Sequence, residues 1–132
     1  ELQAAMGLAV LPYIHEIIAE RKKVVDFYNN RLNTALLTKI KIRDNTDWNY
    51  GYYPVITANE ELLLKIQSAL NEQGIFPRRY FNPSLNTIEY AKGMVMPVSE
   101  SIASRVLCLP LYVGLSETEL DTICNIIIQS IK

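Results

Sequence analysis

The 132-residue chain lacks most of the patterns that mark a complete enzyme. His15 is its only histidine, and no second histidine or cysteine stands near it at the spacing of a metal site. The sequence also has no glycine-rich phosphate loop and no GxSxG elbow. We therefore expect a solvated or capping role for His15, and we assign no catalytic, cofactor-binding or metal-binding residue within the chain.

The chain also has little charge excess, no long apolar run and few cysteines. Thirteen basic side chains oppose fourteen acidic ones, which argues against binding to nucleic acid or to an anionic membrane. Apolar runs such as 8–11 and 126–128 are far shorter than the roughly 20 residues that cross a bilayer. Cys108 and Cys124 lie in apolar surroundings, as buried free thiols do. We expect a soluble, cytoplasmic protein with neither nucleic acid nor a membrane as partner.

The remaining composition is that of one ordinary globular domain. Hydrophobic residues make up 49% of the chain and charged residues 20%, enough for a single core over residues 1–132. The chain begins inside a helical pattern without an initiator methionine and without a signal-peptide pattern. This start leads us to expect a piece of a longer protein.

Hydrophobic periodicity predicts an α+β chain in which helices and strands are mixed. The helices are expected at 2–10, 12–33, 60–73, 99–105 and 116–131. The strands are expected at 39–43, 50–57, 75–81 and 106–112. This order predicts a two-layer sandwich, in which helices cover a small antiparallel or mixed sheet and a long N-terminal helix precedes it.

Capping residues support two of these helices. Asn59 is a favourable N-cap, Gly74 is a favourable residue just past a helix end, and residues 116–119 form a capping box. Pro54 lacks a ladder donor, so we expect an edge position or a bulge at that point of its strand.

One segment, residues 77–86, has the side chains of a ligand site. Its arginines and aromatic rings can clamp a diphosphate and stack on a sugar or base, because a guanidinium fork matches phosphate oxygens. An exposed strand end with solvated arginines explains the same residues equally well. On a regular strand, Arg78 and Tyr80 share one face, while Arg79 takes the other. Phe81 is then expected to turn into the core, and Asn86 to reach back from the loop.

A second aromatic cluster covers residues 48–53. Rings at this density pack in a core or a subunit interface more often than they form a ligand platform. Alternation along the strand would place Tyr50 and Tyr52 on one face and Tyr53 on the other.

Four blocks of the sequence together resemble the small domain of the DegT/StrS-type sugar aminotransferases. These blocks are residues 1–8 with their continuation to Tyr28, residues 52–55, residues 74–83 and residues 107–112. The resemblance implies a fold-type I homodimer whose large domain holds pyridoxal phosphate and whose small domain closes over the substrate. The cofactor lysine, the acid at the pyridinium nitrogen and the phosphate cup would all lie upstream of Glu1.

The resemblance also implies the site residues. Arg78, Tyr80, Phe81 and Asn86 are expected to contact the substrate. Many relatives place a histidine shortly after the proline of the substrate loop, whereas this chain has residues 84–86 as Ser-Leu-Asn, which leaves Asn86 as a substitute. The segment is most similar to enzymes that make 3-amino-3,6-dideoxyhexoses on a nucleotide carrier.

Two functions are compatible with the sequence. In the first, the parent enzyme moves an amino group from glutamate to a keto-sugar nucleotide, and this domain supplies substrate contacts and packing but no turnover alone. In the second, the chain is a free-standing α+β binding or regulatory module.

Overall fold

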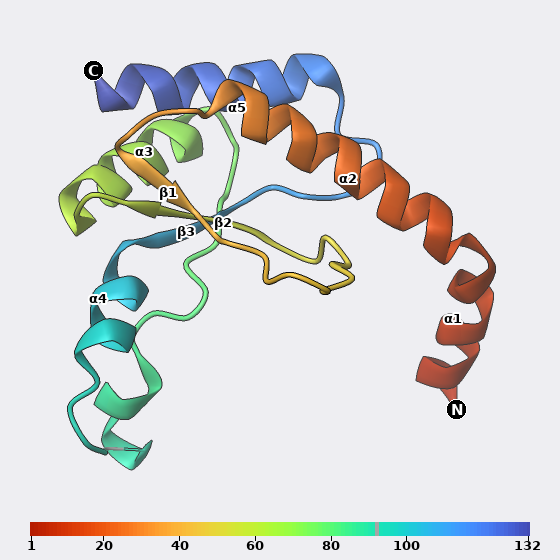
Figure 1. The fold of residues 1–132 in the computed structure, drawn as a ribbon, viewed down its shortest axis with the longest axis horizontal. Helices are drawn as coiled ribbons and strands as arrows, with labels where there is room; N and C mark the ends of the chain where they lie inside the picture. Colours follow the sequence, from red (N-terminus) through yellow and green to blue (C-terminus); the bar gives the residue numbers. More distant parts are fainter. Residues whose placement is uncertain (92) are drawn as a thin grey trace.

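A short antiparallel sheet lies at the centre of the chain in the computed structural model, which describes residues 1–91 and 93–132. Its strands are β1 (Leu37–Lys39), β2 (Tyr53–Thr57) and β3 (Val106–Leu109), in the order β1-β2-β3 (Figure 1). In the register of the sheet, Leu37 pairs with Thr57, and Val55 pairs with Leu107. The prediction of a small antiparallel sheet is therefore confirmed.

The strands are shorter than the sequence pattern predicted, and β1 lies earlier in the chain. The pattern favoured 39–43, but Leu37 is the residue of β1 that is buried, and β1 ends at Lys39. Burial of this one leucine fixes the strand, because a slip by one residue would turn it to solvent.

Pro54 lies in the central strand rather than at an edge, which corrects the prediction. It pairs with Cys108, whose N–H and carbonyl both bond to the backbone of Arg78 on the other side of β3. Pro54 and Cys108 therefore form a non-hydrogen-bonded pair, so the missing N–H of Pro54 would point toward β1. Strand β1 ends at Lys39, which pairs with Val55, so it has no residue opposite Pro54. The proline removes no ladder bond.

Three helices cover one face of the sheet and enclose the core, as Figure 1 shows. They are α2 (Ile14–Arg31), α3 (Glu60–Glu72) and α5 (Glu117–Ile131). The best-covered side chains come from all three helices and from the sheet, and include Tyr28, Val55, Leu63, Leu70, Leu107 and Ile127. This arrangement is the predicted α+β sandwich.

The predicted caps are in place. The Asn59 side chain accepts a hydrogen bond from the Leu62 N–H, and Ser116 and Glu119 form the reciprocal capping box at the start of α5. Gly74 follows α3 with φ = 74°, a left-handed conformation that glycine adopts without steric cost.

The N-terminal helix stands largely outside this core. Helix α1 (Leu2–Val10) continues through a short 3₁₀ turn, η1 (Leu11–Tyr13), which contains Pro12, into α2. None of the nine residues of α1 is buried, and in Figure 1 it extends away from the sheet. By length and composition alone, the stretch Leu2–Arg31 is apolar enough to cross a membrane, which the short apolar runs did not indicate.

The segment at 75–81 is not a strand, contrary to the prediction. Within it, only Arg78 forms a β-bridge, to Cys108, and the chain turns at Tyr80 and Phe81. Phe81 therefore leaves the strand alternation and is 78% exposed rather than turned into the core. Two short 3₁₀ turns, η2 (Leu85–Thr87) and η3 (Glu89–Ala91), follow before α4 (Pro97–Arg105), which leads directly into β3.

Candidate functional site: a cleft beside the Arg78–Tyr80 segment

A cavity of about 730 Å³ runs along the segment that follows α3. We call it the Arg78 cleft. Its other walls are the end of β3 with residues 109–112 and the first turns of α5. Arg78 and Tyr80 both line it and Arg79 does not, so the prediction that these two side chains share a face is confirmed. A volume of this size suits a small organic ligand.

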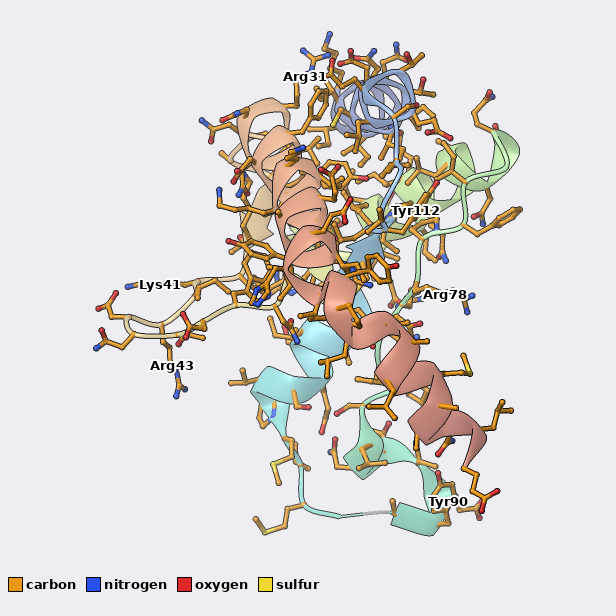
Figure 2. The ribbon with its side chains drawn as sticks, turned by 90° about the vertical axis from the view of Figure 1, so that its right-hand side faces the viewer. Arg31, Lys41, Arg43, Arg78, Tyr90 and Tyr112 are labelled. Carbon is orange, nitrogen blue, oxygen red and sulfur yellow. The ribbon has the colours of Figure 1, made fainter. Side chains whose placement is uncertain are left out.

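The guanidinium of Arg78 is exposed at the mouth of the cleft. Figure 2 shows its side chain pointing away from the ribbon, on the same side as Tyr112 and opposite Lys41 and Arg43. Within the described part of the chain, the guanidinium makes no hydrogen bond or ion pair, which leaves its five donors available to a ligand. A planar fork in this position suits a phosphate or carboxylate better than an ammonium would.

Tyr52 is a cleft residue that the sequence did not identify. Its ring meets the ring of Tyr80 edge-on, with centroids 5.4 Å apart and planes at 73°, and its side chain is 59% exposed. The alternation of side chains along the strand could have identified Tyr52, because a neighbour of the inward-facing Tyr53 points outward.

The other aromatic residues of this cluster serve the core, as predicted. Tyr53 is buried and stacks on Tyr28 at a centroid distance of 4.9 Å. Trp48 and Tyr50 pair at 4.6 Å and pack against the core. Tyr50 has φ = 50°, so the regular alternation does not reach it and it does not face the cleft with Tyr52.

The backbone of the segment is fixed by a pair of hydrogen bonds. The Arg78 N–H donates to the Cys108 carbonyl at 3.0 Å, and the Cys108 N–H donates to the Arg78 carbonyl at 2.8 Å. Cys108 lines the cleft but is buried, and burial raises the pKa of its thiol, an effect that a hydrogen bond from the Tyr80 backbone partly offsets. A thiol protonated in this way is a packing group rather than a nucleophile.

Phe81 lies beside a second cavity, of about 680 Å³, between the 81–88 segment and α4. Tyr80 lines both cavities, and its ring centroid lies 5.4 Å from that of Phe81. Phe81 does not line the Arg78 cleft.

Asn86 organises its own loop. Its Oδ1 accepts from the Ser84 hydroxyl at 2.7 Å, and its Nδ2 donates to the Met94 carbonyl at 3.1 Å and to Glu100 at 2.7 Å. Both amide hydrogens are therefore engaged. Asn86 lines neither the Arg78 cleft nor the second cavity.

The comparisons with known proteins identify the chain. The sequence pattern of the DegT/DnrJ/EryC1/StrS aminotransferase family matches residues 1–128. The chain belongs to this family. A curated DegT-family relative, the dTDP-4-amino-4,6-dideoxy-D-glucose transaminase of Escherichia coli, is 32% identical over 126 residues, covering 89% of this chain and 34% of the relative.

Solved structures of aminotransferases share the fold. The aminotransferase TlmJ from Streptoalloteichus hindustanus superposes with a TM-score of 0.88 at 20% identity, covering 97% of this chain and 35% of that one. The sugar aminotransferase Spr1654 from Streptococcus pneumoniae, described as putative and in its PMP form, superposes with a TM-score of 0.85 at 22% identity, covering 96% and 34%. The chain thus spans about a third of the length of these aminotransferases.

DegT-family sugar aminotransferases use pyridoxal phosphate. The described residues place one lysine, Lys65, at a cavity of about 450 Å³ between α3 and α5. No lysine among them lines the Arg78 cleft or the second cavity. Lys22 and Lys23 pair with carboxylates on α2, and the Lys39 ammonium donates to the Asn29 carbonyl. Among the described residues, no three histidine, cysteine or acidic side chains lie together as metal ligands either.

Proposed function

We propose that this chain is the C-terminal, substrate-side small domain of an aminotransferase that transfers an amino group from glutamate to a keto-sugar nucleotide. In this reaction glutamate leaves as 2-oxoglutarate, and the carbonyl carbon of the sugar receives the amino group. The proposal rests mainly on the convergence of Arg78, Tyr80 and Tyr52 at one cleft in a chain of the DegT family.

Each part of the cleft suits a part of such a substrate. The guanidinium of Arg78 matches the oxygens of a diphosphate. The edge-on pair of Tyr52 and Tyr80 offers ring faces to a sugar or a base. The E. coli relative is named for a dTDP-linked amino sugar, which supports a nucleoside-diphosphate sugar as the substrate class.

The cofactor chemistry belongs to a second domain in this proposal. Pyridoxal phosphate, when bound in the parent enzyme, carries the amino group between the two substrates. The share of about a third of the relatives' length supports its location in a large domain, as does the lack of a lysine at the Arg78 cleft and the second cavity among the described residues. Asn86 and Phe81 then contribute to the substrate side through the loop and the second cavity rather than by lining the Arg78 cleft.

The exposed apolar side chains of α1 support the same assembly. Leu2, Met6 and Leu8 are each more than 60% exposed, which is unusual for an apolar helix in water. Because the DegT-family match includes α1, we assign these side chains to packing against the large domain and the second subunit of a homodimer rather than to a membrane. The buried free thiols support a reducing, cytoplasmic location.

Kinetics of the complete aminotransferase that contains this domain test the proposal. Arg78→Ala and Tyr80→Ala should raise KM for the keto-sugar nucleotide by roughly ten- to a hundredfold, because hydrogen bonds to charged groups are worth about 1.5–3 kcal/mol. The KM for glutamate and the absorbance of bound cofactor should stay unchanged. Arg43→Ala removes the same charge on the opposite side and serves as the control.

The isolated 132-residue chain is the second arm of the test. Mixed with pyridoxal phosphate and both substrates, it should show no saturable turnover. Turnover by the chain alone, or an unchanged KM in both Arg78→Ala and Tyr80→Ala, would refute the assignment.

A further inference from the structure

Arg79 differs from its two neighbours in where its side chain lies. Arg78 and Tyr80 line the Arg78 cleft, whereas Arg79 lies on the opposite side of the segment, where its side chain is only 18% exposed. Arg79 therefore has little access to a ligand in this cleft.

The Arg79 guanidinium joins the ends of two helices. Its Nη2 donates to Oε1 of Glu60 at 2.7 Å and to the carbonyl oxygen of Ser104 at 2.8 Å. Glu60 is the first residue of α3, and Ser104 lies in the last turn of α4. A cation is favourable at the C-terminal end of a helix, where carbonyls lack partners, and an anion at the N-terminal end.

Both helix ends are themselves tied to the end of β2. The Thr57 hydroxyl contacts the carbonyls of Asn59 and Arg105 at 2.7 and 3.1 Å, and the Arg105 guanidinium donates to the Thr57 carbonyl at 3.0 Å. Thr57 is 1% exposed, so this junction belongs to the rigid part of the molecule. Arg79 thus bonds to two helix ends that are themselves held at a buried junction, and not to a loop.

The Arg78–Cys108 bridge alone does not fix the orientation of the residues that follow it. The bridge between Arg78 and Cys108 is isolated, and the chain turns at Tyr80, so the bridge fixes one point of the segment but not the direction of the residues after it. A side chain held on the far side at the next residue fixes that direction, because successive side chains in extended backbone point to opposite sides.

From this geometry we propose that Arg79 is the positioning residue of the Arg78 cleft. Its clamp on Glu60 and Ser104 aims Arg78 and Tyr80 at the substrate in the Arg78 cleft, which Arg79 itself does not line. Arg79 borders the second cavity instead. The reference to substrate rests on the proposed function, whereas the clamp is a property of this chain and can be tested without an enzyme assay.

The direct test measures the contact between the rings of Tyr52 and Tyr80 by nuclear Overhauser effects in the 132-residue chain. Arg79→Met keeps the apolar stem but removes both hydrogen bonds, and should abolish the cross-peaks between the rings. Arg79→Lys keeps the charge and should retain part of their intensity. Arg43→Met, at an exposed arginine on the opposite side, should leave them unchanged. Intact cross-peaks in Arg79→Met would overturn the proposal.

Glu60→Ala keeps the test decisive if Arg79→Met does not fold. This variant removes the exposed partner of the clamp, leaves the Ser104 contact in place and should weaken the same cross-peaks. Full retention of the cross-peaks in Glu60→Ala would also overturn the proposal.

The complete aminotransferase provides an independent measurement. Arg79→Met should raise KM for the keto-sugar nucleotide roughly tenfold, as misplacement of binding groups does, while kcat and the KM for glutamate change little. Arg79→Lys should restore part of the loss. If Arg78→Ala raises KM and Arg79→Met does not, the positioning role is refuted. If Arg78→Ala is silent, the proposed function fails, and the cross-peaks alone decide the clamp.

Discussion

The hydroxyl of Tyr28 in α2 donates a 2.9 Å hydrogen bond to the carbonyl oxygen of Pro110, 82 positions later in the chain. The Tyr28 ring is fully covered and stacks on Tyr53, whose own hydroxyl bonds to Asn29 at 2.8 Å. Pro110 lines the Arg78 cleft. Helix α2 therefore holds one wall of the cleft in place.

Tyr28→Phe should lower the free energy of unfolding by about 1 kcal/mol, because it removes one hydrogen bond and leaves the Pro110 carbonyl without that donor. Urea denaturation followed by circular dichroism measures the change. Tyr90→Phe is the matched control, since Tyr90 is 87% exposed and lies at the far tip of the 82–96 loop in Figure 2. Equal stability of both variants would contradict the structural role of the bond.

The loop that contains Asn86 should loosen in acid. Hydrogen bonds from the Met96 backbone and from the Asn86 side chain hold the pKa of Glu100 below its ordinary value of 4.5. A depressed folded-state pKa stabilises the loop above pH 4.5, and the contribution is lost as the pH falls through the lower, folded value. The Met96 amide resonance should move over this range.

Glu100→Gln should produce the loosened loop already at neutral pH. Glu61→Gln, at an exposed carboxylate on α3, should leave the loop and its acid transition unchanged. If the chemical shift of the Met96 amide changes neither in acid nor in Glu100→Gln, then the Glu100 carboxylate does not organise this loop.

The two cysteines should resist alkylation in the folded chain. Burial raises the pKa of Cys124 to about 11 and also raises that of Cys108, and both thiols are buried. At pH 8 the thiolate, which is the reactive form, is scarce and inaccessible. Mass spectrometry after iodoacetamide treatment should show no adduct in buffer and two in urea. Rapid labelling of the native chain would show that the domain does not hold this fold alone.

Self-association of the isolated chain should depend on α1. Leu8→Glu introduces a charge among the exposed apolar side chains of α1 and should shift the chain toward monomer in analytical ultracentrifugation, without changing the urea midpoint. Leu64→Glu, at a 48% exposed leucine on α3, adds the same charge elsewhere. An equal effect of the two substitutions would show that total charge, not the apolar side chains of α1, controls association.

Local signals in the sequence located the helices well and the strands less well. The Asn59 cap and the Ser116–Glu119 box specify helix ends by contacts within four residues, so the sequence contains all of the information. The limits of β1 depend on Leu37 meeting a core built from distant helices, which no local pattern encodes.

The site was predictable in part for the same reason. Alternation placed Arg78 and Tyr80 together because Arg78 occupies one true bridge position. The alternation failed at Phe81 because the chain turns there. The partnership of Arg79 with Glu60 and Ser104 joins residues 19 and 25 positions away, so it required the tertiary structure.

Helix α1 and the core of the chain should unfold separately. Since none of the residues of α1 enters the core, fraying of the first ten residues exposes no core side chain and need not await global unfolding. Amides near the buried Val24 and Tyr28 should exchange with solvent only through global unfolding, whereas those near Leu2 and Met6 should exchange through local fraying. Along this single helical stretch, the amide exchange rate should therefore rise from α2 to α1. Docking of a partner on α1 would then selectively slow exchange of the first ten amides.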